Sequence, residues 1–233
     1  MSHLDNIRRI EIVSDTLKDL RDKVVFVGGS TVSLYANGVE PFDSRVTDDV
    51  DGIVQVANYS AHADFEEQLR KRGFVDDITS RVRCRYIIRN PVENVIVDIM
   101  PTENINMGFK NRWYTDGFKN SIEYTITPDK AVRILAPSYF LATKLEAFNT
   151  RGKEDGYISK DFEDIVYVFE NRDIVWAELR SANEDVKQYL IEEFERLLNH
   201  KNLTDWISYH VQFKSPPPTE IILRELKEFT KKK

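Results

Sequence analysis

Two short motifs in this chain of 233 residues have the residue types and spacing that phosphate and metal chemistry need. Gly28, Gly29 and Ser30 follow a short apolar run, and a glycine turn that opens a helix can hold a phosphate through backbone N–H groups. Asp49 and Asp51 are two residues apart, so on a strand both carboxylates project from one face. Mg²⁺ prefers oxygen ligands of this kind. Together the motifs predict metal-dependent chemistry on a nucleoside triphosphate.

A third acid, Asp98, lies inside the apolar run from Val95 to Met100. A carboxylate there is costly to bury unless it is paired or bound to a metal. One alternative is that a single arginine satisfies it. We expect instead that Asp98 joins Asp49 and Asp51 in a three-carboxylate metal site, with Asp48 facing away.

Several elements must position these groups. Apolar runs at 24–27, 50–56, 82–89 and 95–100 predict strands, and the Asn90-Pro91 turn predicts that the last two are antiparallel. Periodic apolar residues predict helices over 4–22, 30–35 and 61–72, and the aromatic stretch 109–127 suggests a further hairpin. The expected fold class is α+β, a mixed sheet flanked by helices.

The pattern changes near Ala136-Pro137, after which helical periodicity dominates. Helices are expected over 138–150, 159–170, 174–198 and 220–230. We therefore expect a catalytic domain over 1–136 and a C-terminal domain, a helical bundle region, over 137–233.

The acids and the glycine turn resemble the nucleotidyltransferase superfamily, whose fold is that of DNA polymerase β-like catalytic domains. A narrower resemblance, to the AbiEii/AbiGii abortive-infection toxins, covers most of the first 170 residues. It rests on a series of motifs in order: Gly28-Gly29-Ser30, Arg45-x-Thr47-x-Asp49-Val50-Asp51, Asp98, the helical stretch from Lys144 to Arg151, and the stretch from Ser159 to Ile165. Two positions depart mildly from the usual pattern: Lys160 stands where arginine is more frequent, and Ser30 replaces threonine.

The resemblance implies roles for these residues. It implies that the glycine turn binds triphosphate, that the three acids hold Mg²⁺ (two ions expected), and that one acid helps activate the attacking hydroxyl. It implies that Lys144 contacts phosphate and Asp161 is a further active-site acid. The nucleotide-binding set it implies is Gly28, Gly29, Ser30, Arg45, Thr47 and Lys144.

Two groups of charged residues have both a functional and an ordinary explanation. Lys144 and Arg151 can share one helix face, as Asp161 and Asp164 can on the next, and the ordinary alternative is salt bridges between helices. Arg81, Arg83 and Arg85 alternate along a predicted strand, so they are candidates for contacting the phosphates of an RNA acceptor. The alternative is a solvated sheet face with carboxylate partners.

The leading hypothesis is transfer of a nucleoside monophosphate from an NTP to an acceptor hydroxyl. The resemblance suggests the 3′ end of a tRNA or another RNA as acceptor, with toxicity restrained by an antitoxin protein. A small-molecule nucleotidyltransferase of the aminoglycoside-modifying kind is a second possibility. A nucleotide-binding module without turnover is a third.

Composition limits the class of protein. A net charge of −6 and a pI near 5.4 argue against non-specific DNA coating. The single cysteine, Cys84, cannot form a disulfide within the chain. No apolar run approaches the roughly 20 residues that span a bilayer, and no signal peptide is visible. We expect a cytoplasmic protein that does not enter the membrane.

Overall fold

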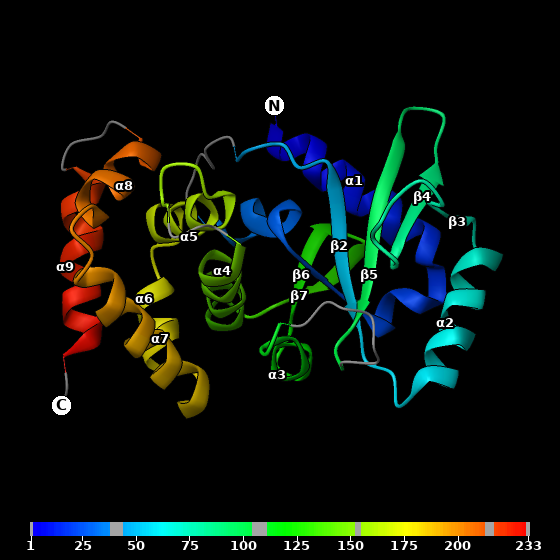
Figure 1. Cartoon of the computed structure of the whole chain (residues 1–233). Helices are drawn as coiled ribbons and strands as arrows, with labels where there is room; N and C mark the ends of the chain where they lie inside the picture. The colour runs from blue at the N-terminus through cyan, green and yellow to red at the C-terminus, as the bar shows by residue number, and fades with distance from the viewer. Residues whose placement is uncertain (1, 38–43, 104–110, 152–154, 213–216, 232–233) are drawn as a thin grey trace. The chain divides into compact units, whose positions relative to one another are not determined.

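The computed structural model describes residues 2–37, 44–103, 111–151, 155–212 and 217–231, with side chains from residue 4 onward. The chain forms two compact units (Figure 1). The first comprises Met1–Leu34 and Asp43–Ala136, and the second comprises Tyr35–Phe42 and Pro137–Lys233. The sequence changes character at the same position, 136/137, and the division into a catalytic domain and a C-terminal domain stays a prediction.

The first unit is built on a seven-stranded mixed sheet in the order β3-β4-β5-β2-β1-β7-β6. The strands are β1 (Val24–Val27), β2 (Asp49–Val54), β3 (Phe74–Asp76), β4 (Arg85–Arg89), β5 (Asn94–Pro101), β6 (Ile122–Thr127) and β7 (Lys130–Ile134). The central strand β2 runs antiparallel to β1 and parallel to β5. With the helices of this unit the sheet makes an α+β fold, as expected.

Helices complete the first unit: α1 (Ser2–Leu17), the 3₁₀ helices η1 (Lys18–Lys23) and η2 (Gly29–Tyr35), α2 (Tyr59–Lys71) and α3 (Tyr114–Lys119). Ile10, Val13 and Leu17 are fully buried at helical spacing, which explains why α1 packs on the sheet. Asn58 caps α2 by accepting a hydrogen bond from the Ala61 amide. Gly73, with φ +98°, follows the end of that helix.

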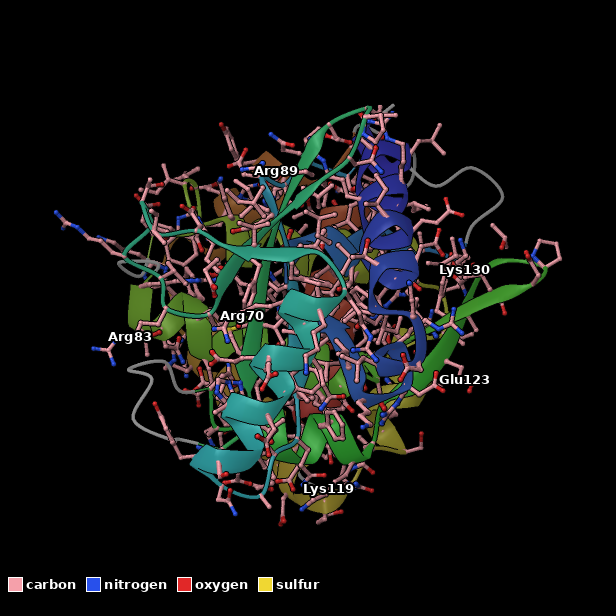
Figure 2. The ribbon with its side chains drawn as sticks, turned by 90° about the vertical axis from the view of Figure 1, so that its right-hand side faces the viewer. Arg70, Arg83, Arg89, Lys119, Glu123 and Lys130 are labelled. Atoms are coloured by element: carbon pink, nitrogen blue, oxygen red, sulfur yellow. The ribbon has the colours of Figure 1, made fainter. Side chains whose placement is uncertain are left out.

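The expected hairpin over 109–127 is wrong. Residues 109 and 110 lie outside the described residues, and α3 occupies part of the rest. Asp116-Gly117 belongs to that helix, and Trp113 and Tyr114 are buried. The hairpin is formed instead by β6 and β7, and Figure 2 shows Glu123 and Lys130 on it. Lys130 ties the hairpin to α1 through ion pairs with Glu11 and Asp15.

The second unit is helical. Its α-helices are α4 (Pro137–Arg151), α5 (Lys160–Asn171), α6 (Val175–Arg180), α7 (Glu184–Leu198), α8 (Leu203–His210) and α9 (Pro218–Thr230). The single helix expected over 174–198 is two helices, interrupted at residues 181–183, and α8 was not expected. Ser159 caps α5, because its hydroxyl accepts from the Phe162 amide.

Aromatic side chains form much of the second unit's core. Phe162 lies 5.3 Å from Phe148 and 5.7 Å from Trp206 between ring centroids. These contacts bring α4, α5 and α8 together. In the described part of the chain, no helix combines the length and the apolar character that crossing a bilayer requires.

Candidate active site

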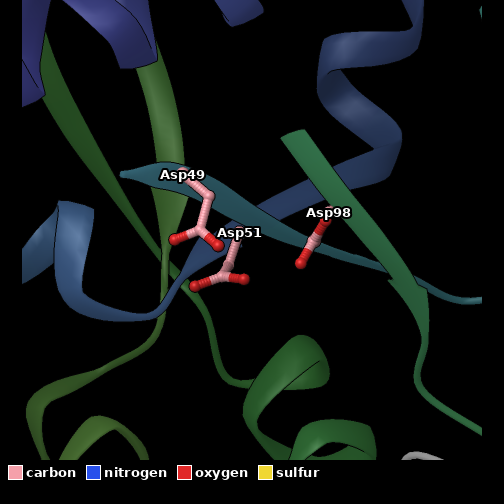
Figure 3. Close-up of side chains that lie close together, drawn as sticks. All are labelled: Asp49, Asp51 and Asp98. Carbon is pink, nitrogen blue, oxygen red and sulfur yellow. The ribbon is translucent and has the colours of Figure 1, made fainter. Parts of the chain in front are cut away.

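Three carboxylates converge on the sheet of the first unit. Asp49 and Asp51 come from β2, where alternate residues share a face, and Asp98 comes from the adjacent parallel strand β5. The strand register places Asp51 directly opposite Asp98. Each of the three offers an oxygen within 4.8 Å of the others (Figure 3). This spacing is short enough for one cation to contact all three acids.

Asp98 is 7% exposed, whereas Asp49 and Asp51 are partly accessible and Asp48 is exposed. Burial raises the pKa of the Asp49 carboxyl, the nearby charge of Asp98 raises it further, and the Arg85 guanidinium opposes both. Carboxylates crowded in this way repel one another unless a cation lies among them. The cluster is therefore an oxygen-rich site that favours a hard cation.

Arg85 lies against two of these acids. From β4, opposite Asp98, its Nε donates to Asp98 Oδ1 at 2.8 Å and its Nη2 donates to Asp98 Oδ2 at 2.8 Å. The same Nη2 donates to Asp49 Oδ2 at 2.8 Å. The hydrogen bonds to Asp98 raise the pKa of Arg85. The arginine partner that we considered for Asp98 is therefore present, together with the two further acids.

The prediction of an arginine row along one strand is wrong. The strand β4 begins at Arg85, so Arg81 and Arg83 lie before it in an irregular segment, where both are exposed. In Figure 2 Arg83 projects away from the ribbon. Contact of these residues with an acceptor stays a prediction.

The glycine turn lies beside the carboxylates. Gly28 follows β1, whose last residue Val27 is opposite Asp51. A Cβ on Gly28 would lie 2.0 Å from Asp51 Oδ2, and φ is +74° there. A side chain at this position would therefore collide with the acid, and the backbone conformation itself favours glycine. The two motifs found in the sequence thus meet in space.

Gly29 makes a second close approach. A Cβ there would lie 2.2 Å from Arg45 Nη2, so the Arg45 guanidinium packs directly on the turn. The helix expected over 30–35 is the 3₁₀ helix η2, and Thr31 Oγ1 closes the turn by donating to Gly28 O at 2.9 Å. Arg45 therefore places a positive charge next to backbone amides that could hold a phosphate.

Ser30 is 1% exposed, and its Oγ has no hydrogen-bond partner among the described residues. A buried hydroxyl without a partner carries a free-energy cost that a ligand oxygen would remove. The orphan hydroxyl, the Arg45 charge and the side-chain-free turn all fit a bound phosphate group.

Two residues of α1 support this region, although the sequence patterns did not predict a role for either of them. Asn6 Nδ2 donates to Arg45 O at 2.9 Å, and Asn6 Oδ1 accepts from the Thr47 amide at 3.2 Å. Arg9 donates to Thr47 O and pairs with Glu93. Thr47 in turn donates to Asp49 O at 3.1 Å. Asn6 precedes Ile10 by four residues, so its place on the buried stripe of α1 was a signal available in the sequence.

Lys144, Arg151, Asp161 and Asp164 gather in the second unit, from α4 and α5. Lys144 Nζ lies 3.3 Å from Asp161 Oδ1 and 2.5 Å from Asp164 Oδ2. Arg151 Nε donates to Asp161 Oδ2 at 2.9 Å. Burial disfavours the charged form of Asp161, but the Arg151 hydrogen bond and the Lys144 charge outweigh it and lower the pKa of Asp161. The interhelical salt bridges are present, and the nucleotide roles of Lys144 and Asp161 stay predictions.

Comparison with known proteins gives two findings. The profile of the family described as "Nucleotidyl transferase AbiEii toxin, Type IV TA system" matches residues 12–232. The fold is similar to the crystal structure of an antigenic nucleotidyltransferase-like protein from Paracoccidioides brasiliensis, with a TM-score of 0.54 and 16% sequence identity, covering 91% of this chain and 96% of that one. No curated protein sequence matches the chain significantly.

Proposed function

Since the chain belongs to the nucleotidyl transferase AbiEii toxin family, we propose that it transfers a nucleoside monophosphate from an NTP to the hydroxyl of an RNA acceptor, with Mg²⁺ as cofactor. The observation that carries the proposal is the convergence of three carboxylates within 4.8 Å, with one of them packed against the glycine turn. The site thus has oxygen ligands for a metal and a cradle for a phosphate next to each other.

Asp49, Asp51 and Asp98 are the residues that would hold the metal, and two ions are expected. Mg²⁺ when bound supplies charge neutralisation for the triphosphate and acidifies the acceptor hydroxyl. On the phosphate side, Ser30 Oγ donates to a phosphate oxygen, and Arg45 offsets the charge of the β- and γ-phosphates. Thr47, which donates to Asp49 O, keeps that acid in place.

The acceptor oxygen forms a bond to the α-phosphorus while the bond from that phosphorus to the bridging oxygen of the β-phosphate breaks. Pyrophosphate leaves with the electron pair of that bond. The hydroxyl proton passes to a carboxylate oxygen of one of the three acids, which acts as general base.

The acceptor we propose is the 3′ end of a tRNA or a similar RNA, and an antitoxin protein would restrain the activity. The toxin family supports this choice over a small-molecule acceptor. Arg81 and Arg83, both exposed, are the proposed contacts for the RNA backbone.

Incubating the protein with each labelled NTP, Mg²⁺ and total cellular RNA tests the proposal. We expect one RNA size class to become labelled. Asp49→Asn and Asp51→Asn should abolish the label, whereas Asp48→Asn, which removes the same charge from an exposed neighbour, should keep it. Equal labelling by all four proteins would overturn the assignment. In a parallel reaction, an aminoglycoside replaces the RNA. Labelling of the aminoglycoside and not of RNA would show a small-molecule transferase.

A further inference from the structure

The Arg85 guanidinium occupies the oxygens that a metal ion would need. Its three hydrogen bonds, each 2.8 Å long, take both oxygens of Asp98 and Oδ2 of Asp49. The pair with Asp98 is bidentate, the geometry in which arginine binds carboxylates best. Cross-strand register fixes this contact, because Arg85 lies directly opposite Asp98.

The same contact has two opposite electrostatic consequences. Without metal, one positive charge among three clustered carboxylates reduces their mutual repulsion and holds Asp49 and Asp98 together. When a divalent cation enters, that positive charge repels it and competes for its ligands. The side chain of Arg85 is only 23% exposed, so water screens this repulsion weakly.

We propose that the Arg85 guanidinium acts as the counter-cation of the three carboxylates and that a divalent metal ion displaces it. It holds the acids in position when no metal is present, and it lowers the affinity of the site for free divalent cation. This proposal rests on the proposed function. The phosphate oxygens of an incoming NTP can accept hydrogen bonds from the displaced guanidinium. The metal ion therefore binds more tightly together with the nucleotide than by itself.

Mn²⁺ alone is the probe that tests the proposal. Its affinity for the full-length chain without nucleotide is measured by electron paramagnetic resonance or calorimetry. Arg85→Gln should bind Mn²⁺ about tenfold more tightly, or better, because a repelling charge within contact distance is gone. Arg85→Lys keeps the charge and should stay near the wild type. Arg89→Gln, which removes a charge from an exposed position on the same strand, should change nothing (Figure 2).

A second expectation concerns nucleotide. Adding a non-hydrolysable NTP analogue should strengthen Mn²⁺ binding more in the wild type than in Arg85→Gln. The reason is that only the wild type has a guanidinium to transfer from carboxylate to phosphate. This difference between the two proteins is not expected of a residue that merely supports the strand.

The wild type provides a test that does not depend on the folding of Arg85→Gln. In protein with ¹⁵N-labelled arginine, the Arg85 Nε–H signal, identified by its loss in Arg85→Lys, should shift as Mg²⁺ is added. An unmoved signal at saturating Mg²⁺, or Mn²⁺ affinity that is equal or weaker in Arg85→Gln, overturns the proposal. If neither protein binds Mn²⁺ without nucleotide, the proposal also fails. The RNA-labelling assay reports on the proposed function separately.

Discussion

Two charged clusters, one in each unit, differ in how their carboxylates are arranged. In the first unit three carboxylates lie within 4.8 Å of one another, and Arg85 pairs with two of them, Asp49 and Asp98. In the second unit Asp161 pairs with Lys144 and Arg151, and Asp164 pairs with Lys144. Three crowded carboxylates favour the binding of a further cation, whereas carboxylates that pair with lysine and arginine between helices support the fold.

The two clusters should also differ in their effect on the stability of the fold. Crowded carboxylates raise the free energy of the folded protein, and a protein retains them where they hold a cation. A buried, fully paired cluster loses stability when one partner is removed, because the other charge is left without compensation. Replacing an aspartate by asparagine should therefore have opposite effects on stability in the two units.

Asp51→Asn should reduce nucleotide transfer by about a thousandfold, since loss of a metal ligand removes several kcal/mol of transition-state stabilisation. Its thermal unfolding temperature without metal should be equal to or above that of the wild type, because one repelling charge is gone. Labelled-NTP incorporation and differential scanning calorimetry measure the two effects. If the variant is inactive because it unfolds, Asp51 supports the fold, and the expectation that its charge is destabilising is wrong.

Asp161→Asn should destabilise the second unit by about 1–3 kcal/mol, because the buried Lys144 loses one of its two carboxylate partners and keeps only Asp164. Urea unfolding followed by tryptophan fluorescence measures this, since Trp176 and Trp206 both lie in the second unit. Asp173→Asn, an exposed aspartate of the same unit, is the control and should change stability little. A fully stable Asp161→Asn would show that the cluster does not support the fold.

Asn6→Ala should cost about 1–3 kcal/mol, because it leaves the buried Thr47 amide without its acceptor. Its effect on transfer should be a raised KM for NTP, as the 45–47 segment carries Arg45 to the glycine turn. Steady-state kinetics at several NTP concentrations give the split between KM and kcat. A loss confined to kcat would indicate that α1 acts on the chemical step and not on nucleotide binding.

The pH dependence of the second cluster should be the smallest effect. The pKa of Asp161 is below 3.8 in the folded state, so its stabilising contribution is complete above pH 3.8 and is lost as the pH falls through the folded pKa. Arg151→Gln should move this loss to higher pH and cost about 1 kcal/mol at most at neutral pH, because the Arg151 side chain is 64% exposed. Urea unfolding at a series of pH values, from neutral down through the folded pKa of Asp161, measures the cost at neutral pH and the pH at which the stabilisation is lost. An unchanged pH profile would show that Lys144 alone lowers the pKa of Asp161.

Local periodicity accounts for what could be predicted from the sequence. Residues two apart share a strand face, which predicted the Asp49 and Asp51 pair. The Asn58 and Ser159 caps are equally local, because each side chain accepts a hydrogen bond from an amide three residues further on. The family motifs supplied the order of the glycine turn, the acids and the helical lysine, and the family match bears out that resemblance. These features depend on a few neighbouring residues, so they could be predicted from local sequence patterns.

Contacts between side chains that are far apart in the sequence depend on how the helices and strands pack. Arg85 binds Asp98 and Asp49, rather than joining a row with Arg81 and Arg83, because strand register places it opposite Asp98. Asn6 reaches the 45–47 segment only because α1 packs on the sheet. The break between helices α6 and α7 and the position of the β6–β7 hairpin were likewise not predicted from residue spacing. Residue spacing repeats every two or 3.6 positions, but it carries no information about register between distant elements, and that register sets which side chains pair in each cluster.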